Sequence, residues 1–229
     1  MLLSFRQRAL RAFILGLPGI LLLPFVLRLP PDVAPALVML NPLLLLGIAA
    51  LVGALAAPRT GLTSALLCGT PLRLRVLPFF AVLGLVCGLA VAVLDHVTAP
   101  LWAPTGAAAL RENRDLADLA IGLLYGGLTE EVIFRWGLVS ILALGLARLM
   151  PVRRAVIAAM ILAALIFALS HLPAALFEFG VATWALVART LILNVILGLI
   201  YGMALLRNGL EAAILAHMGT HLGFSLAAL

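Results

Sequence analysis

Apolar runs long enough to cross a membrane alternate with short polar breaks along the whole chain. About 20 apolar residues in a helix span roughly 30 Å of hydrocarbon, so each such run predicts one transmembrane helix. The runs cover residues 9–28, 34–57, 76–95, 117–149, 154–172, 183–206 and 210–228. The pattern predicts an all-α, polytopic membrane bundle of about seven helices (six to eight).

The breaks between the runs are too short to fold as a soluble domain, so residues 1–229 are interpreted as a single membrane domain. The run 117–149 is overlong for one span, which predicts that it is tilted, kinked or broken, with Gly126-Gly127 as the candidate position. The most polar stretch is 96–118, and its charged residues could cap the helix that follows. They are Arg111, Glu112, Arg114, Asp115 and Asp118.

Composition agrees with a membrane protein and changes how the positive charge is interpreted. Hydrophobic residues make up 65% of the chain and charged residues 10%, whereas a soluble domain is about half apolar and a quarter charged. All 15 basic residues are arginine, and most stand at the ends of apolar runs, where they act as topology signals. The excess of positive charge therefore predicts no nucleic-acid partner. The absence of lysine, with abundant Ala, Leu and Gly, favours a GC-rich bacterial source and hence a bacterial inner membrane.

The arginines also predict an orientation, because loops on the cytoplasmic side carry more Lys and Arg. With a cytoplasmic N-terminus, ten arginines lie inside and four outside, while Arg135 lies within the membrane. The inner set is Arg6, Arg8, Arg11, Arg59, Arg73, Arg75, Arg148, Arg153, Arg154 and Arg207, and the outer set is Arg28, Arg111, Arg114 and Arg189. The first 36 residues imitate a signal peptide, but the spans that follow favour a first helix that stays in the membrane.

Three ionisable residues stand together inside the run 117–149. Each costs about 2.5–3.5 kcal/mol at the centre of an inserted helix, so a structural or functional reason is expected. Glu131 and Arg135 are four residues apart and share a helical face, which predicts an ion pair. Glu130 lies about 100° around the helix from Glu131, which leaves its carboxylate available for chemistry. A purely structural cluster of ion pairs between helices is the alternative.

Histidines in two later runs are the other candidates for chemistry. Phe167 and His171 are four residues apart, so the aromatic ring can pack against one side of the imidazole. His217 and His221 have the same spacing, as in a zinc-binding helix, but Met218 stands where the H-E-x-x-H motif has Glu. Each histidine could instead be a structural residue that hydrogen-bonds to a neighbouring helix.

Depth along straight helices provides a test of whether these residues can meet. At 1.5 Å per residue, Glu130 lies about 27 Å from Arg148, and His171 lies about 26 Å from Arg154. From Arg207, His221 lies about 21 Å away and His217 about 15 Å. The spacing predicts that Glu130, His171 and His221 reach one level, with His217 a turn closer to the cytoplasm.

The ordered pattern Glu130-Glu131-x-x-x-Arg135, Phe167-x-x-x-His171 and His217-x-x-x-His221 resembles the three motifs of the CPBP family. These are the CAAX-processing and bacteriocin-processing intramembrane proteases, also called the Abi family. The resemblance covers about 117–228, a CPBP-like catalytic core within the single domain. Residues 1–116 match only as apolar helices.

The resemblance implies an endopeptidase that hydrolyses a peptide bond with activated water. It gives Glu130 the role of base, gives His171 the role of holding the water, and gives His217 the stabilisation of the oxyanion. Position 221 is usually Asn or Asp in the family; His221 could still donate a hydrogen bond. His171, His217 and His221 could also hold zinc with a glutamate. We favour metal-free chemistry, with no cofactor required.

The motif helices contain no Gly-x-Ser-x-Gly and no cysteine, which favours direct attack by water. The resemblance implies a membrane-embedded or lipidated peptide as partner, with a CAAX-like tail or a sorting signal as candidate substrates. Two other functions stay open. Glu and His inside a bundle also form the proton relays of transporters, although no inverted repeat is visible. A catalytically inactive family member could serve as an immunity or scaffold protein.

Overall fold

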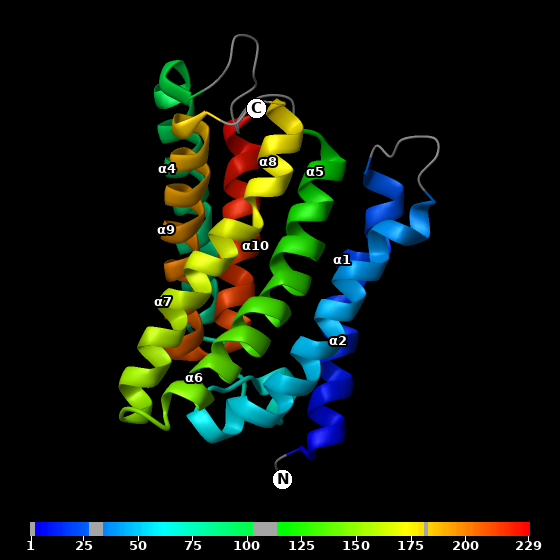
Figure 1. Cartoon of the computed structure of the whole chain (residues 1–229), viewed down its shortest axis with the longest axis vertical. Coiled ribbons are helices and arrows are strands. Elements are labelled where there is room, and N and C mark those ends of the chain that lie inside the picture. The colour runs from blue at the N-terminus through cyan, green and yellow to red at the C-terminus, as the bar shows by residue number, and fades with distance from the viewer. Residues whose placement is uncertain (1–2, 28–33, 103–113, 181–182) are drawn as a thin grey trace.

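The computed structural model describes residues 3–27, 34–102, 114–180 and 183–229 (Figure 1). No strand occurs in these residues, and the all-α prediction is confirmed. In chain order the helices are α1 (Phe5–Val26), α2 (Pro35–Thr60), α3 (Ala65–Cys68), α4 (Leu77–Trp102), α5 (Leu116–Ile121), η1 (Gly122–Val139), α6 (Ser140–Leu146), α7 (Val152–Ser170), α8 (Leu172–Phe179), α9 (Trp184–Asn208) and α10 (Leu210–Ala227).

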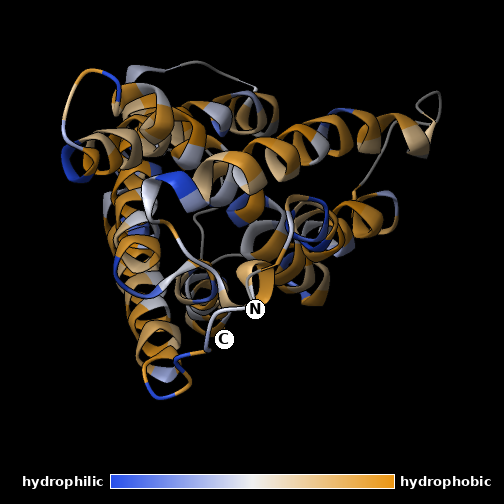
Figure 2. Cartoon of the chain, turned by 90° about the horizontal axis from the view of Figure 1, so that it is seen from below, coloured by the Kyte–Doolittle hydropathy of each residue, from blue (hydrophilic) through white to orange (hydrophobic). Residues whose placement is uncertain are grey.

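Five helical segments among the described residues are long and apolar enough to cross a membrane. They are Phe5–Val26, Ala36–Thr60, Leu77–Trp102, Val152–Phe177 and Trp184–Asn208. The other two predicted runs are also helical, as α5-η1-α6 and as α10, and they carry Glu130, Glu131 and two of the histidines. Hydrophobic residues cover most of each helix (Figure 2). Many large apolar side chains face outward, as expected for an integral membrane protein.

Helix α10 lies inside the bundle and packs on α4, α9 and η1. Its approach to α4 depends on small residues. A Cβ atom added at Gly84 or Gly88 would overlap the carbonyl groups of Ala216 and Thr220 on α10. Gly219 meets the backbone of α4 in the same way. This is the small-xxx-small packing by which membrane helices bring their backbones together, and it fixes the rotation of the histidine-bearing helix.

Helices α1 and α2 pack against the other side of η1, at one edge of the bundle (Figure 1). Thr129 donates a hydrogen bond from Oγ1 to the carbonyl oxygen of Gly16 over 2.6 Å. Gly53 of α2 lies against the indole of Trp136, which is fully buried. These contacts hold η1 so that the next residue after Thr129, Glu130, faces away from α1.

Helices α7 and α9 run antiparallel in close contact. A Cβ atom at Gly202 would meet Met160, and one at Gly198 would meet Ala164. The two pairs define the register of the two helices: moving one residue forward along α7 corresponds to moving one residue backward along α9. Helix α7 ends at Ser170, so His171 stands at the junction with α8.

The polar stretch before α5 caps this helix as predicted. The Asp115 carboxylate accepts a hydrogen bond from the backbone N–H of Asp118, and the Asp118 carboxylate accepts one from the N–H of Asp115. Arg28, Arg111 and Glu112 lie outside the described residues. The orientation of the chain in the membrane stays a prediction.

Candidate active site

The residues with Glu130, Glu131 and Arg135 are wound with the wide turns of a π-helix, from Gly122 to Val139. π-turns are rare and are frequently found at functional sites. The overlong run is not broken at Gly126-Gly127, because helix continues from Leu116 to Leu146, and its winding changes at Gly122 and after Val139. The α-helical angle between Glu130 and Glu131 therefore does not apply. What places their side chains is the packing of η1 on α1, α2 and α10.

Glu131 lies at the centre of a buried polar cluster. Arg135 Nη1 is 3.3 Å from Glu131 Oε1, and the two side chains are 3% and 0% exposed. His217 Nδ1 lies 2.8 Å from the same oxygen. Glu131 is thus the partner of both Arg135 and His217, whereas spacing along the chain indicated only the first contact. A carboxylate paired with arginine accepts hydrogen bonds, so the His217 proton is placed on Nδ1.

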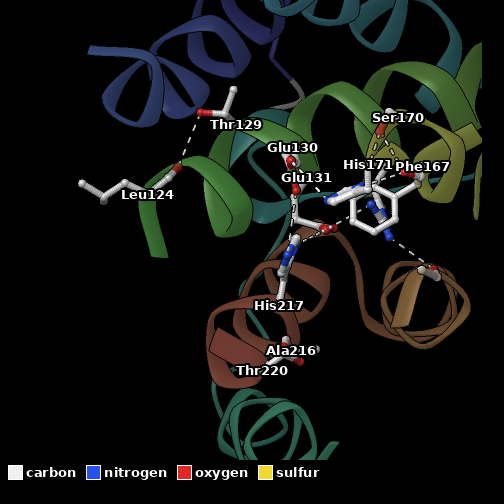
Figure 3. Close-up of polar contacts among 12 residues, drawn as sticks. Leu124, Thr129, Glu130, Glu131, Phe167, Ser170, His171, Ala216, His217 and Thr220 are labelled. Atoms are coloured by element: carbon white, nitrogen blue, oxygen red, sulfur yellow. Dashed lines mark hydrogen bonds and ion pairs between the residues drawn. The ribbon is translucent and has the colours of Figure 1, made fainter. Parts of the chain in front are cut away.

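Glu130 faces two histidines from different helices (Figure 3). Its Oε1 is 4.0 Å from His171 Nε2, and its Oε2 is 3.9 Å from His217 Nε2. Both separations are too long for a direct hydrogen bond and suit a bridging water molecule. The Glu130 side chain is 15% exposed and that of His171 is 32% exposed, so solvent can reach this group.

Depth along straight helices predicted that His221 would reach the level of Glu130, with His217 a turn away. In the structure His217 comes within 4.0 Å of Glu130 and His221 does not. The reason is the packing of α10 through its glycines, which sets the rotation and tilt that a count of residues omits.

Aromatic rings fix the orientation of the two histidines near Glu130. The His217 ring stacks on Tyr201 with centroids 4.3 Å apart, and the His171 ring lies 4.5 Å from Phe167. His171 Nδ1 is also 2.8 Å from the carbonyl oxygen of Phe167. Since a carbonyl oxygen only accepts, this contact places the His171 proton on Nδ1 and leaves Nε2 to accept a hydrogen bond on the side of Glu130.

The same aromatic residues enclose Arg135. Its guanidinium carbon lies 4.5 Å from the Phe167 ring centroid and 5.2 Å from that of Tyr201. Its Nη2 donates to the carbonyl oxygen of Gly198 over 3.3 Å. Arg135 therefore ties η1 to α7 and α9, and the ion pair with Glu131 is part of a network that spans the helices of the site.

His221 lies next to His217 on α10, with ring centroids 5.1 Å apart. Its Nδ1 is buried and has no hydrogen-bond partner among the described residues. The ring has room because η1 has glycine opposite: a Cβ atom at Gly126 would lie 2.7 Å from His221 Nε2 and 3.2 Å from His217 Nε2. Gly126 thus allows η1 to approach both histidines.

A cavity of about 230 Å³ is lined by His171, His217 and His221. The remainder of its wall is apolar except for polar side chains from α9 and from the start of α5. The wall also includes Arg114, Phe179, Arg189, Thr190, Asn194 and Tyr201. The cavity gives a substrate access to the histidine-bearing end of the site.

The positions of the possible donor atoms test whether this site could hold a zinc ion. Among the described residues, no three His, Cys, Asp or Glu side chains are grouped so that they could hold a metal ion. The Glu130 oxygens lie 3.9 and 4.0 Å from the histidine nitrogens that face them. A zinc ion needs several such donors grouped about one centre at about 2.0–2.2 Å, and no group of three is present among the described residues.

Helix α9 contributes residues to the site that were not predicted from the sequence. Arg189, Thr190, Asn194 and Tyr201 line the cavity from one side of this helix. Asp95 on α4, fully buried, lies 2.7 Å from Arg189. The sequence did contain a signal for this face of the helix. Thr190, Asn194 and Tyr201 are separated by four and seven positions within an apolar run, which places them on one helical face.

Comparison with known proteins identifies one family. Residues 112–223 match the sequence model of the Rce1-like family, described as type II CAAX prenyl endopeptidase Rce1-like. The matched region contains all three motifs, and the family resemblance that they predicted is confirmed. The comparisons with curated proteins and with solved structures gave no match.

Proposed function

We propose that this protein, whose residues 112–223 belong to the Rce1-like type II CAAX prenyl endopeptidase family, is an intramembrane endopeptidase that uses a water molecule activated by Glu130. The observation that supports this mechanism is the pair of gaps at Glu130, 4.0 Å to His171 and 3.9 Å to His217. One water molecule can lie within hydrogen-bond distance of these groups and donate one hydrogen to the carboxylate and the other to an accepting histidine nitrogen.

Glu130 takes a proton from this water as its oxygen attacks the carbonyl carbon of the scissile peptide bond. His171 or His217 orients the water by accepting its second hydrogen, because each has its own proton on Nδ1 and presents Nε2 as an acceptor. Glu131 maintains this state of His217, as the third group of a catalytic triad orients its histidine. Glu130 then returns the proton to the leaving amine nitrogen, and the carbon–nitrogen bond breaks.

The negative charge on the carbonyl oxygen needs a donor in a site of low dielectric constant. The family resemblance gives this role to His217, but the Nδ1 proton of His217 is engaged with Glu131. We assign the role to His221, whose ring lies beside His217 at the cavity wall and whose Nδ1 has no partner among the described residues. His221 stands where the family usually has Asn or Asp, and its N–H can donate a hydrogen bond.

The family implies a membrane-associated peptide as substrate. A cavity within a helical bundle, with apolar walls and a polar end, suits an extended peptide segment with apolar side chains. The arginine pattern of the sequence further supports a bacterial inner membrane with the N-terminus in the cytoplasm.

The test compares the wild-type protein with Glu130→Gln, both purified in detergent, on a library of quenched peptides. Loss of general-base catalysis should reduce cleavage by about 10²–10⁴-fold. The matched control is Glu211→Gln, since Glu211 is a buried glutamate that accepts hydrogen bonds from Ser64 and the N–H of Leu66, away from the cavity. Cleavage by Glu130→Gln at the wild-type rate would rule out this mechanism.

A further inference from the structure

A second groove lies between α4 and α9, near the start of α4 and the end of α9. Its volume is about 410 Å³, and it shares no lining residue with the cavity that contains the histidines. Asp95 and Arg189 meet toward the other ends of the same two helices. Arg207, which lines the groove, stands 18 positions after Arg189, or about 27 Å along α9. The groove is therefore a separate site at the opposite end of this helix pair.

Each helix presents an apolar face to this groove. On α4, the lining residues Phe79 and Leu83 are four positions apart and share one face. On α9, Ile200, Met203 and Arg207 follow the three- and four-residue spacing of a single face. Phe79 is 63% exposed and Met203 is 37% exposed, so the groove opens on the outside of the bundle. In an integral membrane protein, this outer surface is in contact with lipid.

Two arginines stand at the same end of the groove, one beside each helix. Arg75 precedes α4, and Arg207 lies in the last turn of α9. Both side chains are exposed, and neither guanidinium group has a hydrogen bond or ion pair with a described residue. Arg73 lies next to them, because its Nη1 donates to the carbonyl oxygen of Arg207 over 3.4 Å. Three positive charges are thus grouped at one end of an apolar groove.

No carboxylate of a described lining residue offsets this charge, since none of these residues is acidic. Glu211 is the acidic residue nearest in sequence to Arg207, but it is buried and accepts hydrogen bonds from Ser64 and from the N–H of Leu66. The guanidinium groups of Arg75 and Arg207 are therefore available to an external anion. A guanidinium group binds a phosphate through parallel hydrogen bonds, so arginine is well suited to phosphate recognition.

The chemistry of the groove matches the two parts of a phospholipid. The arginines match the phosphate, and the apolar face from Arg207 back to Ile200, about 10 Å long, matches the first part of an acyl chain. A headgroup with net negative charge is favoured over a zwitterionic one, because no described lining residue is an acid that could receive an ammonium group. Basic pockets between membrane helices bind anionic lipid headgroups. The three arginines also belong to the set predicted on the cytoplasmic side, where the leaflet is anionic.

We propose that the groove between α4 and α9 binds an anionic phospholipid, with Arg75 and Arg207 on the phosphate and an acyl chain against the apolar faces of both helices. Both helices pack on α10, which carries His217. A lipid in the groove contacts α4 and α9 together and stabilises the folded bundle. The inference does not depend on the proposed endopeptidase function, because lipid binding and stability are measured without cleavage of any peptide.

The experiment compares phosphatidylglycerol with phosphatidylcholine of the same acyl chains. Binding of each lipid to the protein, purified in detergent, is measured by native mass spectrometry. Phosphatidylglycerol should bind more tightly to the wild type. The double variant Arg75→Gln, Arg207→Gln should lower its affinity by about 25-fold, because each basic residue near a membrane surface contributes a factor of about five. Equal affinities of the wild type for the two lipids would overturn the proposal.

The matched control removes the same charge from another part of the bundle. Arg6 and Arg59 are exposed residues of α1 and α2, the helices at the edge of the bundle away from α4 and α9 (Figure 1). The double variant Arg6→Gln, Arg59→Gln should keep the affinity close to that of the wild type, because salt screens exposed charges that are far from the groove. An equal loss in the two double variants would show general attraction to positive charge and would contradict a site at the groove.

A third variant tests the apolar part of the groove. Leu83→Trp places a larger side chain in the groove without a change of charge, and should weaken the binding of phosphatidylglycerol severalfold. The melting temperature without lipid shows whether this variant is folded. If it is not, the variants of the exposed arginines carry the test. Wild-type affinity in a folded Leu83→Trp variant would contradict the seating of an acyl chain against α4.

Thermal unfolding distinguishes a lipid from free phosphate. Phosphatidylglycerol in large excess should raise the melting temperature of the wild type by about 5 °C, because a ligand that binds only the folded state stabilises it. The double variant Arg75→Gln, Arg207→Gln should lose most of this shift. Glycerol phosphate, which has the phosphate without acyl chains, should produce little shift. A shift with glycerol phosphate as large as that with the lipid would identify a site for free phosphate and overturn the proposal.

Discussion

His217 Nδ1 lies 2.8 Å from Glu131 Oε1, in a region where neither side chain is more than 4% exposed. This contact joins η1 to α10 and determines which nitrogen of His217 carries the proton. The opposite nitrogen, Nε2, faces Glu130 at 3.9 Å. The neighbouring carboxylates thus have different partners: Glu131 contacts Arg135 and His217 directly, whereas Glu130 lies 4.0 and 3.9 Å from two histidine nitrogens, distances that a water molecule bonded to both groups can bridge.

Arg135→Leu should destabilise the protein strongly. It leaves Glu131 buried without its cation, and breaking a buried ion pair by removing one partner costs about 3–5 kcal/mol. It also removes the donor to the Gly198 carbonyl. Thermal unfolding in detergent measures the effect. Arg148→Leu is the matched control and should leave the melting temperature almost unchanged, because its side chain is exposed.

Gly126→Ala should reduce activity by more than tenfold. The added methyl group would lie 2.7 Å from His221 Nε2, so the imidazole or η1 must shift, and a displacement of about 1 Å can reduce catalysis about 10²-fold. Gly47→Ala is the control, because Gly47 lies in α2 with no atom within 4 Å of the added Cβ atom. That variant should be active and slightly more stable, by up to about 1 kcal/mol. Equal activity in both variants would show that the close approach at Gly126 is unimportant.

His221→Asn should keep most of the activity, whereas His221→Ala should lose about 10²–10³-fold in kcat. The reason is that an asparagine side chain can donate a hydrogen bond to the oxyanion and alanine cannot, and removing one oxyanion donor costs about that factor. Steady-state kinetics on a cleaved peptide measures kcat and KM separately. If His221→Ala retains the wild-type kcat, the oxyanion is stabilised by another group.

Treatment with a chelator should leave activity unchanged. Within the described part of the chain, no three potential ligands are grouped so that they could hold a metal ion. The measurement is Glu130-dependent cleavage before and after chelation, with the zinc content per chain determined in parallel. Stoichiometric zinc and loss of cleavage on chelation would contradict the metal-free mechanism.

Part of the site follows from local spacing. Glu131 and Arg135, four positions apart, form an ion pair even though their helix is wound with π-turns. Phe167 and His171 are also four positions apart, and their rings are in contact. Spacing along the chain predicted both contacts because neighbours on one helix meet without help from other helices.

The sequence by itself determined that the chain is an all-α membrane protein with three ordered motifs, because hydrophobic run length and helical spacing are local properties. Only the tertiary structure decided that His217, and not His221, faces Glu130. It also decided that Arg189 shares a cavity with the histidines. These relationships depend on how each helix is rotated and tilted against its neighbours. Close packing at residues such as Gly84 and Gly219 sets that rotation, and no count of residues along a single helix contains it.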